Sequence, residues 1–199
     1  SKDRIYKLCW EAKEYNFGAV CVNPYYVPLA YKLLKGSDVK VCSVVGFPFG
    51  ATTTLVKLQE AIEAVKNGAE EIDMVMNICA FLSGKEKDYQ YVRDEINKVV
   101  DGCKVTTKVI IEVGFLTDEG KEKACKLAQE AGAHFVKTAT GFGPGAKIKD
   151  VRLMRRVVGK EMGVKAAGGI KSYGMAMAFI NAGANRIGTS SGVSIMEGI

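Results

Sequence analysis

Short apolar runs alternate with amphipathic segments along the whole chain, and this alternation restricts the fold more than any other feature of the sequence. The apolar runs are typical of buried strands and cover residues 19–22, 39–45, 71–77, 106–113, 134–138, 163–166 and 185–188. Between them, apolar residues recur at helical spacings of three and four over residues 54–66, 89–100, 118–131, 148–162 and 173–182. Strands separated by helices need crossover connections, so the sequence predicts an α/β fold with a parallel sheet.

A Gly-Ala pair recurs where a predicted helix ends and the next strand begins, at residues 18–19, 68–69, 132–133 and 183–184. Glycine suits the left-handed residue that ends a helix, and alanine leaves room for a tight turn under the strand. Repeated strand–helix units favour a TIM barrel over an open sheet with helices on both faces. A chain of 199 residues without a shift in composition can bury one core, so we expect a single barrel domain over residues 1–199.

Composition and charge disfavour several classes of protein. The apolar runs are only a few residues long, which predicts neither a membrane span nor a signal peptide. Six cysteines are scattered without close pairs, so we expect reduced thiols in the cytoplasm rather than disulfides or a zinc site. The single histidine, His134, argues against a histidine triad or a metal centre. The net charge of +6 is spread over helices with acidic partners, which favours a phosphorylated metabolite over nucleic acid as a partner.

Two lysines stand at the ends of neighbouring predicted strands. Lys137 and Lys165 each follow an apolar run and precede small residues and glycines, as in loops that let a ligand approach the backbone. Their ammonium groups are expected to lie only a few ångströms apart. A nearby like charge and poor solvation lower the pKa of a lysine, and a neutral amine can attack a carbonyl carbon to give a Schiff base. The sequence therefore predicts covalent carbonyl chemistry.

Side-chain alternation places further charges on the inner face of the sheet. By this parity Lys108 and Glu112 face the same side of one predicted strand, and Asp73 faces inward from another. Ionisable groups are rarely buried without a partner or a task, so these residues and the two lysines are predicted to line an active site. For Lys108 with Glu112, a structural ion-pair network that fills the barrel centre is an open alternative.

Three segments of small residues follow the last predicted strands, at residues 140–145, 168–169 and 188–192. Backbone amides in such loops, with serine hydroxyls beside them, form phosphate sites. Barrel enzymes commonly build this site from the loops after their last strands. Each segment alone could be only a turn or a helix cap, but their succession on adjacent strands favours a phosphate site.

Several of these segments carry a resemblance to a known family. Motifs like those of deoxyribose-phosphate aldolase are VKTATG at 136–141, VKAAGGI at 164–170, EIDMV at 71–75, KVIIE at 108–112, GTSS at 188–191, CVNP at 21–24 and GFPFG at 46–50. The resemblance runs from the first helix to the C-terminus. It implies a TIM-barrel aldolase without a metal or other cofactor that reversibly cleaves 2-deoxy-D-ribose 5-phosphate to D-glyceraldehyde 3-phosphate and acetaldehyde. It also implies a cytoplasmic homo-oligomer, either a dimer or a tetramer.

The resemblance also implies roles for individual residues. Lys137 is identified as the nucleophile that forms the imine, Lys165 as the neighbouring cation that lowers its pKa, and Asp73 as a member of the proton relay. The substrate and its phosphate are expected to contact Lys108, Thr140, Gly141, Gly168, Gly169, Ser190 and Ser191. Phe142 stands where some relatives have a lysine, which puts a phosphate contact from that side chain in doubt.

One strand of the family is missing from the expected element order. Residues 1–16 have the periodicity of the helix that follows the first strand of the family, with one apolar stripe made of Ile5, Leu8, Cys9 and Ala12. We therefore count seven strands and expect a (β/α)8 barrel that lacks its first strand. Either the chain is a fragment or the barrel has an open seam. An open seam would expose two strand edges and apolar helix faces to aggregation, which favours a trimmed or partly disordered N-terminus as the explanation.

Two other functions stay open on the residues alone. The lysines also fit another lysine-dependent aldolase or a phosphosugar isomerase on the same barrel. The phosphate loops also fit a non-catalytic barrel that binds a phosphometabolite without turning it over.

Overall fold

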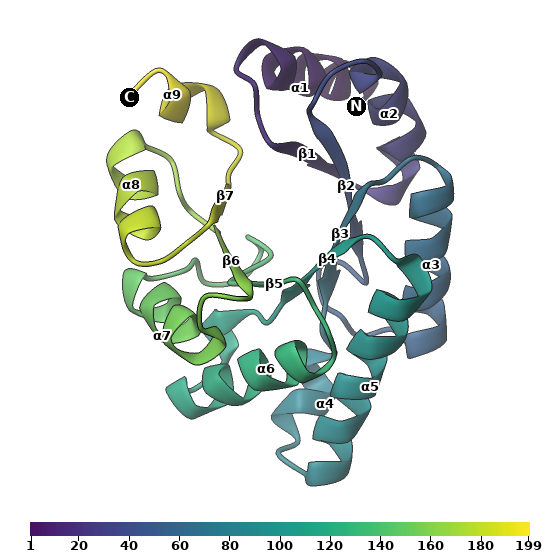
Figure 1. Cartoon of the computed structure of the whole chain (residues 1–199), viewed down its shortest axis with the longest axis vertical. Coiled ribbons are helices and arrows are strands. Elements are labelled where there is room, and N and C mark those ends of the chain that lie inside the picture. The colour runs from purple at the N-terminus through teal and green to yellow at the C-terminus, as the bar shows by residue number, and fades with distance from the viewer.

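Seven parallel strands form one curved sheet in the computed structural model, which describes residues 1–199 (Figure 1). The strands are β1 (Ala19–Val22), β2 (Lys40–Val45), β3 (Glu71–Val75), β4 (Thr106–Ile110), β5 (Phe135–Lys137), β6 (Gly163–Ala167) and β7 (Arg186–Gly188). Their order in space is their order in the chain, and every neighbouring pair is parallel. The predicted α/β fold of the TIM-barrel type is confirmed, with seven strands.

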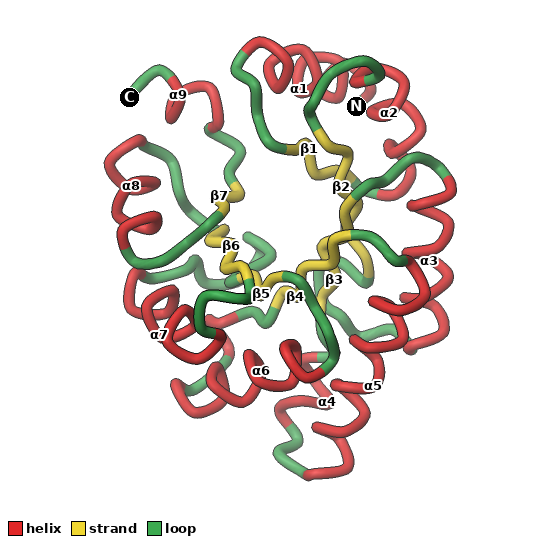
Figure 2. Tube along the Cα trace, viewed as in Figure 1, coloured by secondary structure: helices red, strands yellow, loops and turns green.

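Helices follow the strands and cover the outer side of the sheet (Figure 2). They are α1 (Lys2–Glu14), α2 (Val27–Leu34), α3 (Thr54–Lys66), α4 (Ile78–Leu82), α5 (Glu86–Cys103), α6 (Asp118–Glu130), α7 (Ile148–Val158), α8 (Tyr173–Asn181) and α9 (Gly192–Met196), with 3-10 helices η1 (Pro24–Tyr26) and η2 (Val113–Phe115). None of them is both long and apolar enough to cross a membrane.

The sequence pattern locates the long helices better than the short ones. The helix predicted over 54–66 agrees with α3 at both ends. The helix predicted over 148–162 ends earlier, because Gly159 takes a φ of 68° that favours glycine and stops α7. Helices α2, α4 and α9 are not indicated by the pattern, since five to eight residues show too little periodicity.

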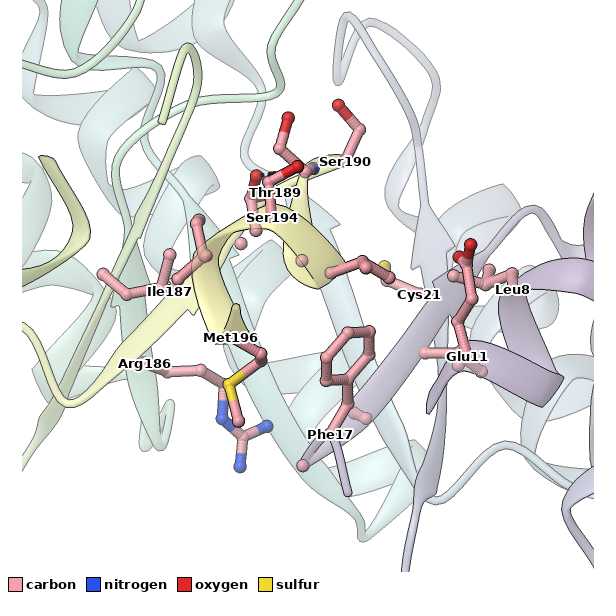
Figure 3. A pocket seen from close by; sticks show the side chains of 18 of the residues that line it. Leu8, Glu11, Phe17, Cys21, Arg186, Ile187, Thr189, Ser190, Ser194 and Met196 are labelled. Carbon is pink, nitrogen blue, oxygen red and sulfur yellow. Dashed lines mark hydrogen bonds between the residues drawn. The ribbon is translucent and has the colours of Figure 1, made fainter. Parts of the chain in front are cut away.

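The sheet has a seam, because β1 and β7 stand at the two ends of the strand order. A cavity of about 810 Å³ lies at this seam and is lined by residues of α1, β1, β7 and α9 (Figure 3). Contacts cross the seam at its rim. Tyr15 donates a hydrogen bond to Glu197, and a Cβ at Gly192 would meet the ring of Phe17 at 2.7 Å. The seven strands counted in the sequence are thus all present, with the seam between the first and the last of them.

The two faces of the sheet differ in chemistry. Outward residues pack under the helices in one continuous apolar cluster, which includes Val41, Ile72, Val109, Val136 and Val164. Burying an apolar side chain of this size stabilises a fold by about 1.5–3 kcal/mol. The inward residues include most of the buried charges of the strands. The apolar layer between sheet and helices therefore stabilises the fold, whereas the charged inner face is the candidate location of the active site.

A fully buried charged pair lies in the helical layer. The side chains of Lys57 on α3 and Glu95 on α5 are fully buried, with 2.7 Å between Nζ and Oε2. Lys57 also donates to the carbonyl of Val75, and Glu95 accepts from the backbone N–H of Asn77. The pair therefore ties two helices to the C-terminal end of β3. Helical periodicity alone does not reveal it, because charged residues on helices usually face solvent.

Candidate active site

Asp73 lies at the centre of a cluster of three lysines inside the barrel. Its carboxylate is fully buried, and Oδ2 accepts hydrogen bonds from Nζ of Lys137 and Nζ of Lys165, each at 2.7 Å. Nζ of Lys108 lies 3.0 Å from the other carboxylate oxygen, Oδ1. Four residues that the sequence assigns to the site are thus brought together from four consecutive strands, β3 to β6.

The register of the sheet explains why these side chains meet. Lys137 is directly opposite Lys165 across β5 and β6, and Asp73 is directly opposite Lys108 across β3 and β4. Opposite residues on neighbouring strands, which lie about 4.8 Å apart, point to the same face. Lys137 pairs with Ile110, two residues beyond Lys108. The long lysine side chains span this stagger and converge on one carboxylate.

A second carboxylate extends the network. Glu71 Oε2 accepts from Nζ of Lys108 at 2.7 Å and from the guanidinium of Arg186 on β7. Burial alone would lower the pKa of Lys108, but Cys42, Asp73 and Glu71 together raise it well above its usual range. Lys108 is therefore held as a cation. Neither Glu71 nor Arg186 was predicted as a site residue, although Glu71 shares the inward parity of Asp73.

Lys108 does lie in a buried network of ion pairs, but Glu112 is not its partner there, so that part of the alternative is wrong. Glu112 lies past the end of β4 with a left-handed φ of 50°, and its Oε2 accepts from the backbone N–H of Thr140 at 3.0 Å and from the Thr140 hydroxyl. Because β4 ends at Ile110, strand alternation does not carry Glu112 to the face that holds Lys108. Lys108 pairs with Glu71 instead, and Glu112 anchors the loop after β5.

The expected fall in the pKa of Lys137 is not found in the free site. Burial disfavours the ammonium form, but the charge and the hydrogen bond of Asp73 outweigh burial and raise the pKa of Lys137. Burial would likewise raise the pKa of Asp73, yet the charges of Lys137, Lys165 and Lys108 hold it well below its usual range. Because a carboxylate bridges the two ammonium groups, attraction to it exceeds their mutual repulsion.

Two cysteines border the same carboxylate. Sγ of Cys42, on β2, is buried and lies 3.2 Å from Asp73 Oδ1, and Sγ of Cys21, on β1, lies 3.9 Å from Oδ2. These three residues form the one group of His, Cys, Asp or Glu compact enough for a metal ion. Three ammonium groups already surround the carboxylate, so a further cation would be repelled. The sequence analysis did not assign the two thiols to the site. Strand alternation could have indicated them, because Cys21 and Cys42 take opposite positions on the neighbouring strands β1 and β2 and face inward.

Ser190 and Ser191, predicted to bind phosphate, line the cavity at the seam together with Lys165. Figure 3 shows the Ser190 side chain beside Thr189 at one end of this cavity. Three further basic side chains line the same space: Arg4, Lys7 and Arg186. Positive charge along a cavity wall favours an anionic ligand. The two basic lining residues from α1, Arg4 and Lys7, were not singled out in the sequence, because exposed basic residues on a helix usually face solvent.

The other predicted phosphate residues lie on the loops after β5 and β6. Gly168 and Gly169 have positive φ values of 102° and 80°, and no atom lies within 4 Å of the position of a Cβ at Gly169. Gly141 likewise has a φ of 94° and open space at its Cβ position. Neither these three glycines nor Thr140 is among the residues that line the cavity at the seam. The hydroxyl and the backbone N–H of Thr140 both donate to Glu112.

Residues 3–198 match a family model described as DeoC/LacD family aldolase. A protein of Thermococcus kodakarensis named deoxyribose-phosphate aldolase is 61% identical, with 100% of this chain and 90% of that protein covered. A protein of the same name from Caldanaerobacter subterraneus subsp. tengcongensis is 57% identical, with 99% and 86% covered. The solved tetrameric structure of deoxyribose phosphate aldolase from Aeropyrum pernix has a TM-score of 0.90 at 34% identity, with 99% and 83% covered.

Proposed function

This chain belongs to the DeoC/LacD family of aldolases, and we propose that it reversibly cleaves 2-deoxy-D-ribose 5-phosphate to D-glyceraldehyde 3-phosphate and acetaldehyde. The observation that carries the proposal is Asp73 Oδ2, which accepts from two lysine ammonium groups at 2.7 Å each. A Schiff-base aldolase needs an amine that gives up a proton and a group that carries protons to and from the intermediates. A carboxylate between two amines meets both needs.

Lys137 is the proposed nucleophile, because it occupies the lysine position of the family motif VKTATG at residues 136–141. It transfers a proton to Asp73, and the free amine attacks C1 of the open-chain aldehyde to give a carbinolamine. Protonation of the carbinolamine oxygen, by way of Asp73, releases water and leaves a protonated imine on Lys137. Lys165 stays an ammonium group and stabilises the Asp73 carboxylate through these transfers.

The protonated imine then acts as the electron sink for cleavage. The hydroxyl on C3 gives its proton to the Asp73 carboxylate, the C2–C3 bond breaks, and the electron pair of that bond moves toward the imine nitrogen to give an enamine. Glyceraldehyde 3-phosphate leaves at this stage. Asp73 returns the proton to C2 of the enamine, and water hydrolyses the resulting imine to release acetaldehyde and regenerate Lys137. One water is lost and one is consumed, so the reaction balances.

The phosphate group is proposed to occupy the space next to Gly168, Gly169 and Ser190. Open space at Gly169 and the basic side chains of the cavity beside Ser190 support this placement. A homo-oligomer, a dimer or tetramer, is also proposed, and the description of the Aeropyrum pernix relative as tetrameric supports it.

The test combines a coupled assay of deoxyribose 5-phosphate cleavage with trapping of the acetaldehyde imine by borohydride, followed by mass spectrometry. Lys137→Arg is expected to abolish both signals, because a guanidinium group does not deprotonate at working pH. Lys126→Arg, on the exposed side of α6, is the matched control and should leave both unchanged. An adduct that persists on Lys137→Arg would assign the nucleophile elsewhere.

The same measurements separate the other functions. Imine trapping without cleavage of deoxyribose 5-phosphate would indicate another lysine-dependent aldolase. Binding of deoxyribose 5-phosphate without trapping or turnover would indicate a phosphometabolite-binding barrel.

A further inference from the structure

Two thiols face each other across the first two strands. Cys21 of β1 is directly opposite Cys42 of β2 in the parallel register. Neighbouring strands lie about 4.8 Å apart, within the range of about 4.4–6.8 Å between the Cα atoms of a disulfide. Their Sγ atoms and the carboxylate of Asp73 all lie within 4.8 Å of one another. A bond between the two sulfur atoms therefore needs no large movement of the backbone.

The two thiols differ in access to solvent. Cys21 is exposed and lines the cavity at the seam, where Figure 3 shows it across from Ser190 and Thr189. Cys42 is fully buried behind it. A small oxidant that enters the cavity therefore meets Cys21 first, because Cys42 does not line the cavity.

The two thiols also differ in acidity. A hydrogen bond from Cys42 lowers the pKa of Cys21, and the charges of Lys165 and Lys137 lower it further, against the opposing effects of burial and Asp73. Burial and the neighbouring Cys21 and Asp73 raise the pKa of Cys42 well above its usual value. The accessible cysteine thus has the greater thiolate character, which is the property that makes a cysteine reactive toward peroxide.

We propose that Cys21 and Cys42 form a peroxide-sensitive pair in which Cys21 is oxidised and Cys42 resolves it as a disulfide. The Cys21 thiolate attacks one oxygen of hydrogen peroxide, the O–O bond breaks, and hydroxide leaves to take up a proton as water. The Cys42 sulfur then attacks the Cys21 sulfenic acid, the S–O bond breaks, and the departing hydroxide takes the proton of Cys42 to form a second water. Two thiols are oxidised, and one peroxide is reduced to two waters.

The disulfide also changes the electrostatics of the catalytic cluster. Burial lowers the pKa of Lys137, and the charge of Asp73 and then that of the Cys21 thiolate raise it. A disulfide carries no charge, so oxidation should lower the pKa of Lys137. This consequence rests on the proposed function, whereas formation of the disulfide does not.

The experiment treats the native folded chain with hydrogen peroxide, blocks remaining thiols under denaturing conditions, and digests without reduction for mass spectrometry. The expected product is a peptide pair linked through Cys21 and Cys42, two hydrogens lighter than the separate peptides and cleaved by dithiothreitol. In Cys42→Ala, dimedone should trap a sulfenic acid at Cys21. Cys79 on α4 is also exposed and gives a matched control, because Cys79→Ala should leave the linked pair unchanged.

Absence of the linked pair, or oxidation of Cys79 before Cys21, would overturn the proposal. This readout does not use aldolase activity, so it can succeed or fail independently of the function proposed above. The electrostatic consequence has its own measurement, which is the pH dependence of imine trapping before and after oxidation. A midpoint that moves to lower pH on oxidation and returns with dithiothreitol is expected.

Discussion

Replacing Asp73 with asparagine should lower the pKa of Lys137, since the carboxylate is what holds its proton. The two charges are 2.7 Å apart, with the carboxylate fully buried. At an effective dielectric constant of about 20, unit charges at this distance attract by about 6 kcal/mol. This attraction is several times the energy of about 1.4 kcal/mol that moves a pKa by one unit, so its loss should lower the pKa of Lys137. The asparagine carbonyl can still accept a hydrogen bond, which offsets part of the fall.

The assay is the rate of imine trapping with acetaldehyde and cyanoborohydride as a function of pH, measured from the mass of the intact chain. In Asp73→Asn the rising limb should move to lower pH, because the amine becomes neutral there and Lys165 still repels its charged form. Turnover of the sugar phosphate should fall even so, by about 10²–10⁴-fold, because the proton relay is lost.

Glu71→Gln is the matched control. Glu71 is a buried inward carboxylate, but it pairs with Lys108 and Arg186 and makes no ion pair with Lys137. Its removal should leave the limb nearly in place. If the limb of Asp73→Asn stays in place or moves to higher pH, the attraction to Asp73 does not control the acidity of Lys137, and the reasoning fails.

The remaining predictions concern charge at three places. Lys165→Leu should raise the pKa of Lys137, because it removes a like charge from beside Lys137 and a competing hydrogen-bond donor from Asp73. The pH profile of imine trapping should then move to higher pH, and an unchanged profile would give Lys165 a structural role. Ser190→Asp should weaken binding of deoxyribose 5-phosphate by about 4 kcal/mol but affect cleavage of unphosphorylated deoxyribose much less, and equal losses would count against the phosphate site. Lys57→Met should lower the free energy of unfolding in urea by about 3 kcal/mol, and adding Glu95→Leu should restore much of this loss. An unchanged free energy of unfolding in Lys57→Met would show that the pair does not stabilise the fold.

The pH dependence of stability follows from the sign of each shift. The folded pKa of Asp73 is depressed, so its contribution is present above the unfolded value of about 3.9 and is lost as the pH falls toward the folded value. The folded pKa of Lys137 is raised, so its contribution is present below the unfolded value of about 10.4 and is lost as the pH rises through the folded value. Between these limits the cluster stabilises the fold.

The parallel architecture and the identity of the inward-facing strand residues could be predicted from the sequence alone. Both depend on local periodicity, because alternation along a strand decides which face a side chain takes and helical spacing marks the crossovers. Asp73, Lys108, Lys137 and Lys165 could be placed on the inner face for this reason, and all four meet in the structure. The seven-strand count could be made in the same way.

The contacts among the inward residues could not be predicted in this way. They depend on the curvature and stagger of the sheet rather than on the periodicity of any one strand. Lys108 forms an ion pair with Glu71 and none with Glu112, which has a left-handed backbone conformation beyond the end of the strand. The pKa of Lys137 likewise depends on a carboxylate 64 residues away in the chain, placed between two ammonium groups that sequence reasoning had considered as an isolated pair. Distances between non-neighbouring strands set the sign of that shift, and no local pattern encodes them.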